Sequence, residues 1–358
     1  MKLTERFQLG FQVLENRMVM APMTRSRALN NIPNDLMAVY YRQRNGAGLI
    51  ITEGTAPSPN ALGYPRIPGI FNKEQTNGWK RITDEVHKSR CKIFVQLMHT
   101  GRVAHPDNMP EGARVLAPSS VPLSGTMYTD ENGEQPYPTA TPMTMNDIEH
   151  TIREYRVASA NAMIAGFDGV EIHGANGYLV DQFLNPCTNK RDDSYGGSTE
   201  NRCRFALEVA KAIGEEIGFD KLGIRLSPYG VFNDMESFED IENTYVYLAE
   251  ELGSLGLCYI HIVDHSSMGA PEVPWRIKSL IRNAFGRPVI ASGGFDKEKA
   301  ERFLEEEKAE LISFARPFLA NPDLVYRFKE GIALNEPDPE TFYTPGKKGY
   351  TDYPFADD

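Results

Sequence analysis

Cysteine is scarce in this sequence, with four residues among 358. They stand singly, and no CxxC pair occurs, which argues against a disulfide framework, a zinc ribbon or an iron–sulfur cluster. The four positions are Cys91, Cys187, Cys203 and Cys258. We therefore expect free thiols in a reducing compartment, which is typical of a cytoplasmic protein.

Long apolar runs and an excess of basic charge are also missing. No stretch approaches the roughly 18 apolar residues of a membrane-spanning helix, and the N-terminus lacks the basic-then-apolar profile of a signal peptide. The 38 Lys and Arg residues against 49 Asp and Glu give a formal net charge of −11. We find no basic patch of the kind that nucleic-acid binding needs. We expect an ordered, soluble protein whose partners are small molecules rather than nucleic acid or membrane.

Short apolar or β-branched runs alternate with amphipathic helical stretches along almost the whole chain. Strands are predicted at residues 17–24, 48–55, 91–99, 169–175, 221–228, 258–264, 288–294 and 309–318. One helical stripe follows Thr144, a good N-cap with Asp147 three residues later, and another ends at Gly256. Alternating strands and helices imply a parallel sheet covered by helices. Eight such strands fit a closed α/β fold, the (β/α)8 TIM barrel, and we expect a single domain over residues 1–358.

Two segments fall outside this alternation. Residues 7–13 predict a small N-terminal hairpin around Gly10, which would plug the bottom of a barrel. Residues 103–143, after the third strand, carry seven prolines and no sustained periodicity. We interpret them as a long excursion over the barrel mouth, the end where functional insertions occur.

The active site of such a barrel lies at the C-terminal ends of its strands. The predicted seventh strand ends in Gly293 and Gly294, and Arg316 lies near the end of the eighth. Backbone N–H groups freed by a glycine turn, together with a guanidinium, form the usual phosphate cradle of this fold. Arg225, inside the fifth strand, is a charge that needs a partner. It forms either an internal salt bridge, for example with Glu171 on the neighbouring strand, or a contact with an anionic ligand.

Three polar side chains lie within one short segment at the end of the fourth strand: His173 closes the strand, and Asn176 and Tyr178 follow it in a segment loosened by Gly174 and Gly177. An imidazole and an amide offer two donors that can converge on one carbonyl oxygen. A phenol stays protonated at neutral pH and can give its proton to a carbanion. The group therefore fits an enolate-like transition state, and the alternative is a structural histidine with a tyrosine packed over the loop.

Several motifs resemble the old yellow enzyme family of FMN-dependent ene-reductases. They are residues 21–25 (APMTR), 96–102 (QLMHTGR), 169–173 (GVEIH) with its continuation to 184, 195–202 (YGGSTENR) and 349–354 (GYTDYP). The likeness covers nearly the whole chain and is closest to bacterial N-ethylmaleimide and pentaerythritol tetranitrate reductases. It implies a TIM barrel that binds a flavin at its mouth.

The resemblance implies a tightly and non-covalently bound FMN. The residues that it assigns to the flavin are Pro22, Met23, Thr24, Gly54, Gln96, Arg225, Gly293, Gly294, Ala315 and Arg316. Thr24 would lie at the O4 and N5 edge and tune the reduction potential, whereas Arg225 would lie beside N1 and O2. By resemblance, therefore, Arg225 faces an anionic ligand.

The resemblance also implies the reaction. His173 and Asn176 would hold the carbonyl or nitro oxygen of an activated alkene, the flavin would deliver hydride, and Tyr178 would protonate the α-carbon. NADPH or NADH would be the transient reductant in a ping-pong order, in line with the absence of a GxGxxG dinucleotide motif. The resemblance implies a cytoplasmic NADPH dehydrogenase or ene-reductase, monomeric or homodimeric. Three residues would wall the substrate pocket: Tyr64, Met98 and Tyr353.

The sequence departs from many relatives at Met98, and at the position of Asn176 the family splits between His and Asn, which keeps a donor but alters substrate preference. Two alternative functions also stay open. Many relatives carry Trp where Met98 stands, so we expect a roomier or more pliable pocket. His99, His173 and His261 close three strands, and a metal-dependent barrel hydrolase is one alternative. The first strand, however, lacks the His-x-His that such hydrolases usually have, and we expect no metal. A catalytically silent flavin-binding barrel is the other alternative.

Overall fold

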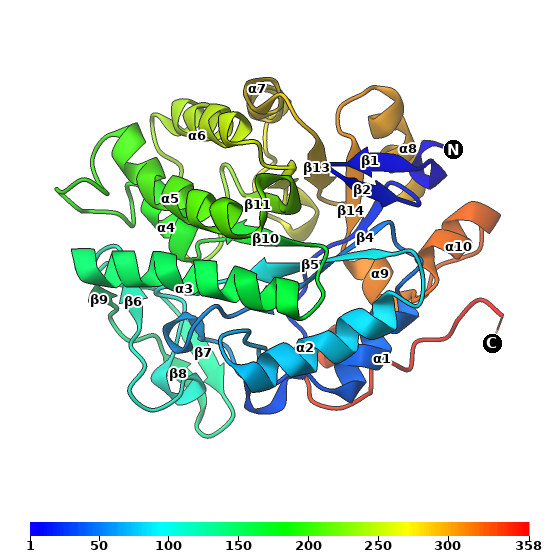
Figure 1. Ribbon diagram of the computed structural model, residues 1–358, viewed down its shortest axis with the longest axis horizontal. Coiled ribbons are helices and arrows are strands. Elements are labelled where there is room, and N and C mark those ends of the chain that lie inside the picture. Colours follow the sequence, from blue (N-terminus) through cyan, green and yellow to red (C-terminus); the bar gives the residue numbers. More distant parts are fainter. Residues whose placement is uncertain (358) are drawn as a thin grey trace.

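The computed structural model describes residues 1–357, and at its centre eight parallel strands close into a barrel (Figure 1). The barrel strands are β3 (Met18–Met20), β4 (Leu49–Thr55), β5 (Lys92–Leu97), β10 (Gly169–Gly174), β11 (Leu222–Leu226), β12 (Tyr259–Val263), β13 (Val289–Ser292) and β14 (Leu311–Phe314). Neighbours in the barrel follow the chain order, and β14 closes against β3. The predicted (β/α)8 barrel is confirmed.

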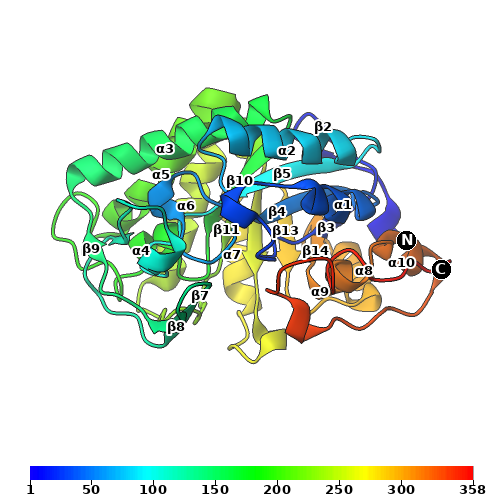
Figure 2. The same ribbon diagram turned by 90° about the horizontal axis from the view of Figure 1, so that it is seen from below.

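Helices surround the barrel, as Figures 1 and 2 show from two directions. They are α1 (Asp35–Gln43), α2 (Lys73–Val86), α3 (Met145–Ile164), α4 (Leu179–Leu184), α5 (Thr199–Ile217), α6 (Ile241–Leu255), α7 (Trp275–Phe285), α8 (Lys297–Glu305), α9 (Arg316–Ala320) and α10 (Leu324–Glu330). Short 3-10 turns lie at Lys2–Thr4, Leu29–Asn31, Pro59–Ala61, Pro106–Asn108, Phe219–Lys221, Ser266–Met268 and Pro339–Thr341. Two predicted helix ends are confirmed, because Thr144 and Asp147 form a capping box before α3 and Gly256 ends α6 in a left-handed conformation.

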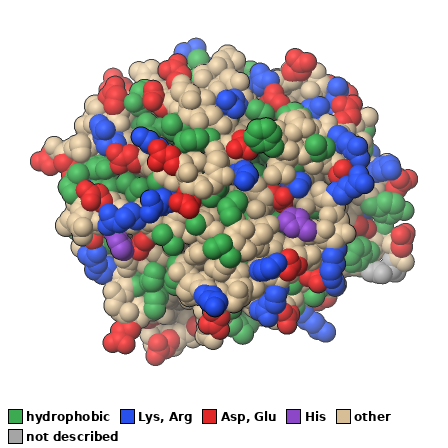
Figure 3. All heavy atoms as spheres, viewed as in Figure 1, with side chains coloured by type: hydrophobic (Ala, Val, Ile, Leu, Met, Phe, Trp, Pro, Cys, Tyr) green, Lys and Arg blue, Asp and Glu red, His purple; other side chains and the backbone are tan. Residues whose placement is uncertain are grey.

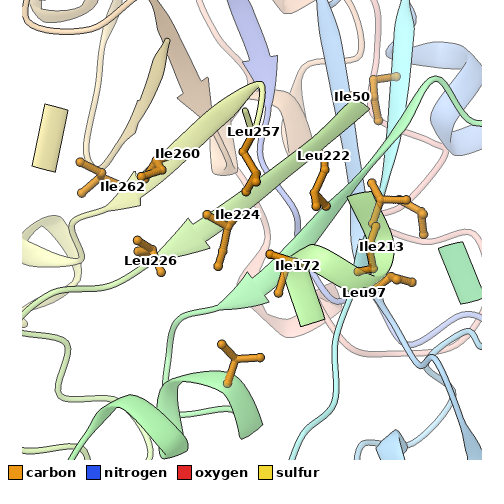
Figure 4. Close-up of a cluster of buried hydrophobic side chains, with 14 of the residues drawn as sticks. Ile50, Leu97, Ile172, Ile213, Leu222, Ile224, Leu226, Leu257, Ile260 and Ile262 are labelled. Carbon is orange, nitrogen blue, oxygen red and sulfur yellow. The ribbon is translucent and has the colours of Figure 1, made fainter. Parts of the chain in front are cut away.

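Alternate side chains of the barrel strands point outward and pack against the helices (Figure 4). Ile172, Ile224 and Ile260 come from β10, β11 and β12 and are fully buried with Ile213 of α5 in one cluster. Burying each such side chain stabilises the fold by about 1.5–3 kcal/mol. Because successive side chains of a strand point to opposite faces, the residues between these isoleucines point into the barrel. This alternation places Glu171, His173, Arg225 and His261 in the interior.

The bottom of the barrel interior is apolar and is closed by the N-terminal hairpin of β1 (Phe7–Leu9) and β2 (Gln12–Leu14). Leu9 and Leu14 of the hairpin join one buried cluster with residues from the first halves of the strands. Phe94 and Tyr259 fill this layer because Gly169 and Gly223 leave room beside them: a Cβ on either glycine would lie within 2.4 Å of a ring atom. The predicted hairpin plug is confirmed.

Residues 103–143 form the long excursion predicted between β5 and α3. The segment contains two small two-stranded sheets, β6 (Leu116–Ala117) with β9 (Thr141–Pro142) and β7 (Thr126–Thr129) with β8 (Gly133–Pro136), visible at the lower left of Figure 2. Met127 of β7 packs with Tyr64 and Tyr178. The guanidinium of Arg102 ties the excursion down, since it donates to the carbonyl of Pro122 at 3.0 Å and to that of Asn233 at 2.7 Å. The excursion therefore covers the barrel mouth, as expected.

Two strands end four residues earlier than predicted, and the other strand ends lie within two residues of the prediction. The last strand was expected over residues 309–318, but β14 ends at Phe314 and α9 begins at Arg316. Pro317 explains the early helix, because proline at the first helical positions fixes a helical φ and lacks an N–H that would have no partner there. The first strand was expected to reach residue 24 but ends at Met20. Pro22 has no N–H for a ladder bond, so the chain leaves the sheet and runs into the mouth.

The surface mixes charges of both signs. On the face shown in Figure 3, acidic and basic side chains are interspersed. None of the helices within residues 1–357 combines the length and the apolarity that crossing a bilayer requires. The predicted free thiols are confirmed, since all four cysteines are unpaired with one another and only Cys187 is not buried.

Candidate active site

A cavity of about 260 Å³ opens at the mouth of the barrel. Its walls bring together residues from six of the predicted strands and from the loops that follow them. The lining residues that the sequence predicted are Pro22, Met23, Thr24, Gly54, Gln96, Met98, His173, Asn176, Tyr178, Arg225, Ala315 and Arg316. Further lining residues that were not predicted are Arg25, His265, Met268, Leu319, Phe342 and Tyr343. Residues separated by up to about 300 positions thus share one site.

Glu171 lies beneath this cavity and is fully buried, and its two oxygens have different partners. Gln96 donates from Nε2 to Oε1 at 2.7 Å, and His261 Nδ1 lies 3.0 Å from Oε2. The register explains the first contact, because Gln96 and Glu171 are direct neighbours across β5 and β10. The carboxylate therefore orients the amide of Gln96, and among the described residues it forms no hydrogen bond or ion pair with Arg225.

Arg225 is left without a direct counter-ion. Its residue is only 6% exposed, and Nε has no hydrogen-bond partner among the described residues. Burial lowers the pKa of the guanidinium, and the nearby negative charge of Glu171 acts in the opposite direction. A buried cation without a partner is costly. Of the two interpretations that the sequence left open, the internal salt bridge is wrong, and the position fits an anionic ligand in the cavity.

A glycine turn and two cations lie at the ends of β13 and β14. Gly293 and Gly294 have positive φ angles of 141° and 57°, and a Cβ on Gly293 would lie 2.3 Å from the carbonyl oxygen of Asp264. Only glycine fits there. Arg316 is exposed at the start of α9, and no residue of the described chain forms a hydrogen bond or ion pair with it. Lys299, which was not predicted as a site residue, points its Nζ at the carbonyl oxygens of both glycines, at 3.5 and 3.4 Å.

The glycine turn does not border the same cavity as the catalytic candidates. Gly293 lines a neighbouring hollow of about 230 Å³ together with Lys278 and Lys299, whereas Arg316 lines the mouth cavity. The pairing of β13 with β14 keeps the two loops adjacent. The arrangement fits a ligand that extends from the mouth to the outer ends of these strands and places an anionic group there.

His173 is a neutral hydrogen-bond donor. Burial, and then the positive charge of Arg225, lower the pKa of its ring well below the usual value. The backbone N–H of Ala175 donates to Nδ1 at 3.3 Å, so the single ring hydrogen belongs to Nε2. The ring of Tyr178 packs edge-on against that of His173, with 4.8 Å between centroids. The imidazole is therefore held in one orientation and one tautomer.

Tyr178 is a protonated phenol with a second phenol beside it. Burial raises its pKa to about 12, although the hydrogen bond from Tyr64 lowers it in part. The two hydroxyl oxygens are 3.0 Å apart. If Tyr64 is the donor, the hydrogen of Tyr178 is free to point at a substrate. Tyr64 does not line the mouth cavity but a larger one outside it.

Met98 lines the mouth cavity. The side chain is 1% exposed and covers Gly54, where a Cβ would lie 2.5 Å from the sulfur. Gly54 is therefore needed for the close approach of a long, flexible side chain.

A second, larger cavity of about 680 Å³ lies outside the first and shares Thr24, Tyr178 and Tyr343 with it. The excursion contributes residues 126–128, 130, 134 and 137, and the C-terminal tail contributes residues 339, 340 and 343–345. Five of its lining residues are tyrosines: Tyr64, Tyr128, Tyr137, Tyr178 and Tyr343. The outer cavity gives bulky molecules access to the mouth.

Tyr353 does not line either cavity. Its hydroxyl instead accepts a hydrogen bond from the backbone N–H of Asp338 at 2.9 Å. The tail is fixed earlier, because the buried guanidinium of Arg27 donates to the carbonyl of Phe342 at 2.7 Å and that of Arg25 donates to Gly349 at 2.7 Å. These contacts bring Phe342 to the mouth and carry Tyr353 past it.

The three histidines considered for a metal site are used differently. Among residues 1–357, no group of three His, Cys, Asp or Glu side chains is placed to hold a metal ion. His99 accepts a hydrogen bond from the N–H of Gly101, and His261 bonds to Glu171. Instead of metal ligands, the site contains the neutral hydrogen-bond donors His173 and Tyr178 and the buried cation Arg225.

A parallel barrel with a phosphate-type turn, an unpaired buried cation and neutral donors at its mouth defines a class of flavin-dependent barrel oxidoreductases. Comparison with known proteins agrees. A model of the NADH:flavin oxidoreductase / NADH oxidase family matches residues 2–335. The chain belongs to this family, and within it to the old yellow enzymes, whose cofactor is FMN and whose reductant is NAD(P)H.

Individual relatives match over nearly their whole lengths. A putative 12-oxophytodienoate reductase of Oryza sativa subsp. japonica is 41% identical over 98% of this chain and 96% of its own. A probable flavin mononucleotide-dependent alkene reductase of Leishmania infantum is 40% identical over 97% and 95%. The structure of morphinone reductase superposes with a TM-score of 0.96 at 41% identity, covering 99% of this chain and 96% of that one. The expected nearness to N-ethylmaleimide and pentaerythritol tetranitrate reductases stays a prediction.

Proposed function

We propose that this chain is an NAD(P)H-dependent ene-reductase that reduces the activated C=C bond of α,β-unsaturated carbonyl and nitro compounds. Maleimides and enones are the substrates we expect, with nitrate esters as further candidates. The observation that carries the proposal is the convergence of His173, Asn176 and Tyr178 on one cavity above the unpaired Arg225. The alkene reductase and morphinone reductase among the relatives support it.

The residues present fit FMN. Three features of the chain call for a flat anionic group: the unpartnered Nε of Arg225, the free guanidinium of Arg316, and the glycine turn that a Cβ at Gly293 would fill. When bound, FMN supplies the hydride for the alkene and receives one from NAD(P)H. The residues that would hold it are Pro22, Met23, Thr24, Gly54, Gln96, Arg225, Gly293, Gly294, Ala315 and Arg316. Glu171 would set the direction in which Gln96 presents its amide.

His173 and Asn176 would hold the substrate oxygen. The neutral His173 offers Nε2–H, and Asn176 offers the N–H of its amide, so two donors can meet one carbonyl or nitro oxygen. As negative charge grows on this oxygen, each donor contributes about 3 kcal/mol by analogy with oxyanion holes.

Tyr178 would supply the proton. Hydride adds to the β-carbon, and the O–H bond of Tyr178 breaks as its proton goes to the α-carbon. Because its pKa is about 12, the phenol holds this proton at neutral pH. Tyr64, 3.0 Å away, can donate to the phenolate oxygen that remains and so stabilise it.

The reductant and the alkene would use the same mouth in turn, which is a ping-pong order. The combined inner and outer cavities, about 260 and 680 Å³, are the space that we assign to both. We infer a cytoplasmic enzyme from its free thiols, and we propose that it acts as a monomer or homodimer on small electrophilic alkenes.

The two alternatives have less support. A metal-dependent hydrolase needs a cluster of ligands, and the histidines considered for it are engaged with Gly101 and Glu171 instead. A flavin-binding barrel without catalytic activity has no need for two hydrogen-bond donors and a phenol in one cavity. In this chain His173, Asn176 and Tyr178 line the same cavity.

The test is an anaerobic assay of purified protein with N-ethylmaleimide, 2-cyclohexenone and a nitrate ester, each with NADPH and with NADH. We expect a yellow protein that releases FMN on denaturation and that oxidises more than one equivalent of nicotinamide per FMN only when an oxidising substrate is present. A colourless protein, or sustained consumption of nicotinamide with maleimide or enone but no reduced alkene formed, would contradict the proposal.

A further inference from the structure

His265 is the one mouth residue whose polar contact goes directly to a proposed substrate donor. It follows β12 and lines the mouth cavity, and its Nε2 lies 2.9 Å from Oδ1 of Asn176. The mechanism above makes no use of it. Its position raises the question of what decides which end of the Asn176 amide faces the substrate.

An amide side chain has one accepting and one donating end, and the two ends are similar in size. Only a donor can occupy Oδ1, so the contact requires a hydrogen on Nε2 of His265. With Oδ1 taken, the amide nitrogen of Asn176 keeps both hydrogens. Within residues 1–357, no protein acceptor is found for them. The donating end is therefore the one left for a ligand in the cavity.

The backbone of Asn176 is fixed by its own hydrogen bonds, so the contact with His265 acts only on the side-chain torsions of Asn176. Its φ is +60°, a left-handed conformation that Asn tolerates better than most residues. Its N–H donates to Oγ of Ser227 at 2.8 Å, and its carbonyl accepts from Nδ2 of Asn233 at 2.7 Å. Only the side-chain torsions stay free, and His265 is the partner that holds them.

The surroundings of His265 favour a neutral ring in one orientation. Phe232 packs edge-on against it, with 4.5 Å between centroids. Burial, and then the positive charge of Arg225 on β11, lower the pKa of His265 to about 4, while Asp264 beside it acts in the opposite direction. A neutral imidazole has a single ring hydrogen, and with that hydrogen on Nε2 the ring donates to Oδ1 of Asn176 at 2.9 Å.

We propose that His265 is a positioning residue that turns the amide nitrogen of Asn176 toward the substrate and so makes the site selective for oxygen acceptors. This inference rests on the proposed function, in which Asn176 holds the substrate oxygen. His265 acts through Asn176 and does not itself touch the reacting atoms.

The test compares two replacements of similar length in the FMN-loaded enzyme. His265→Gln keeps an N–H donor for Oδ1, whereas His265→Met has none. The probe is 4-chlorophenol, titrated through the long-wavelength absorbance band that a phenolate forms over an oxidised flavin. We expect His265→Met to raise the Kd for 4-chlorophenol about tenfold and His265→Gln to stay within about threefold of the original. FMN content and melting temperature serve as folding controls, and His150→Gln, on the exposed face of α3, is the remote control.

A double-mutant cycle shows whether His265 acts through Asn176. Asn176→Ala alone is expected to weaken 4-chlorophenol binding, and adding His265→Met to it should then have no further effect. Equal Kd values for His265→Met and His265→Gln, or additive losses in the double variant, would overturn the inference while leaving the proposed function intact. If Asn176→Ala leaves binding unchanged, the substrate clamp is misassigned, and the inference falls with that part of the proposed function.

Discussion

The two ends of the barrel interior are built from the same strands but from opposite kinds of residue. At the bottom, Phe94, Tyr259 and Leu311 pack with the hairpin leucines in a dry cluster. One or two inward positions further along, the interior holds Gln96, Glu171, His173, Arg225 and His261. Among the described residues, buried polar atoms without a hydrogen-bond partner include Nε of Arg225 and Nε2 of His261 in this upper part, against the hydroxyl of Tyr259 in the bottom cluster.

The two ends of the barrel therefore contribute differently: the apolar bottom stabilises the fold, and the polar mouth carries the proposed function. Burying charge and polar groups without partners destabilises a fold, and the apolar bottom and the layer between strands and helices offset that cost. The mouth can therefore hold a cation ready for a ligand, because the strands that carry it are anchored elsewhere. We expect changes at the mouth to alter chemistry and changes at the bottom to alter stability.

The largest effect is expected for Tyr178→Phe. Loss of a general acid slows the step that it serves by about 100- to 10,000-fold, so reoxidation of the flavin by 2-cyclohexenone should slow by that factor. Reduction of the flavin by NADPH needs no proton from Tyr178 and should be nearly unchanged. Anaerobic stopped-flow measurement of each half-reaction separates the two, and equal slowing of both would count against the proton-donor role.

At the bottom, Leu311→Ala should lower the free energy of unfolding by about 3 kcal/mol, because it leaves a cavity in the cluster under the barrel. The urea midpoint measures this loss. Turnover per bound FMN should stay the same. A Leu311→Ala protein of normal stability but reduced turnover per FMN would break the contrast between the two ends.

Replacing both His173 and Asn176 by Ala removes the two donors of the clamp. The Kd for phenolic ligands should rise about 100-fold, since each charge-assisted hydrogen bond is worth about a factor of ten or more. Absorbance titration of the flavin measures it. An unchanged titration would place the clamp on other residues.

The smallest effect concerns pH. Burial lowers the pKa of His99 to about 3, against an ordinary value of about 6.5. Below pH 6.5 the unfolded chain takes up a proton on His99 that the folded chain does not, so the free energy of unfolding falls as the pH drops toward 3. Between about pH 7 and about pH 5 this amounts to about 2 kcal/mol. Urea unfolding at a series of pH values measures this dependence. For His99→Gln the free energy of unfolding should fall less steeply between about pH 7 and about pH 5 than for the original protein. His150→Gln, which replaces an exposed histidine, should leave this pH dependence unchanged.

Much of the fold and the site could be predicted from local sequence. Alternating apolar runs and helical stripes indicate the barrel, and a barrel necessarily gathers the C-terminal ends of its strands. Residues such as Gln96, His173 and Arg316 could therefore be assigned to one mouth from their places in the sequence alone. The rule would also have pointed to His265, which directly follows β12.

What could not be predicted depends on contacts between distant segments. Glu171 bonds to Gln96 and not to Arg225 because of the strand register. Glu171 is paired with Gln96 across β5 and β10, whereas Arg225 on β11 is paired with His173. Phe342 rather than Tyr353 reaches the mouth because Arg27 holds the tail by its backbone carbonyls, which carry no sequence signal. The early end of β14 reflects competition between strand propensity and the helix start at Pro317.

The most direct test of the account is a two-step anaerobic titration of the purified protein. Addition of NADPH should bleach the flavin absorbance, and subsequent addition of N-ethylmaleimide should restore it with one succinimide formed per FMN. A protein without flavin, or a bleached flavin that no alkene reoxidises, would contradict the claim that the barrel mouth grips FMN and presents it to an activated alkene.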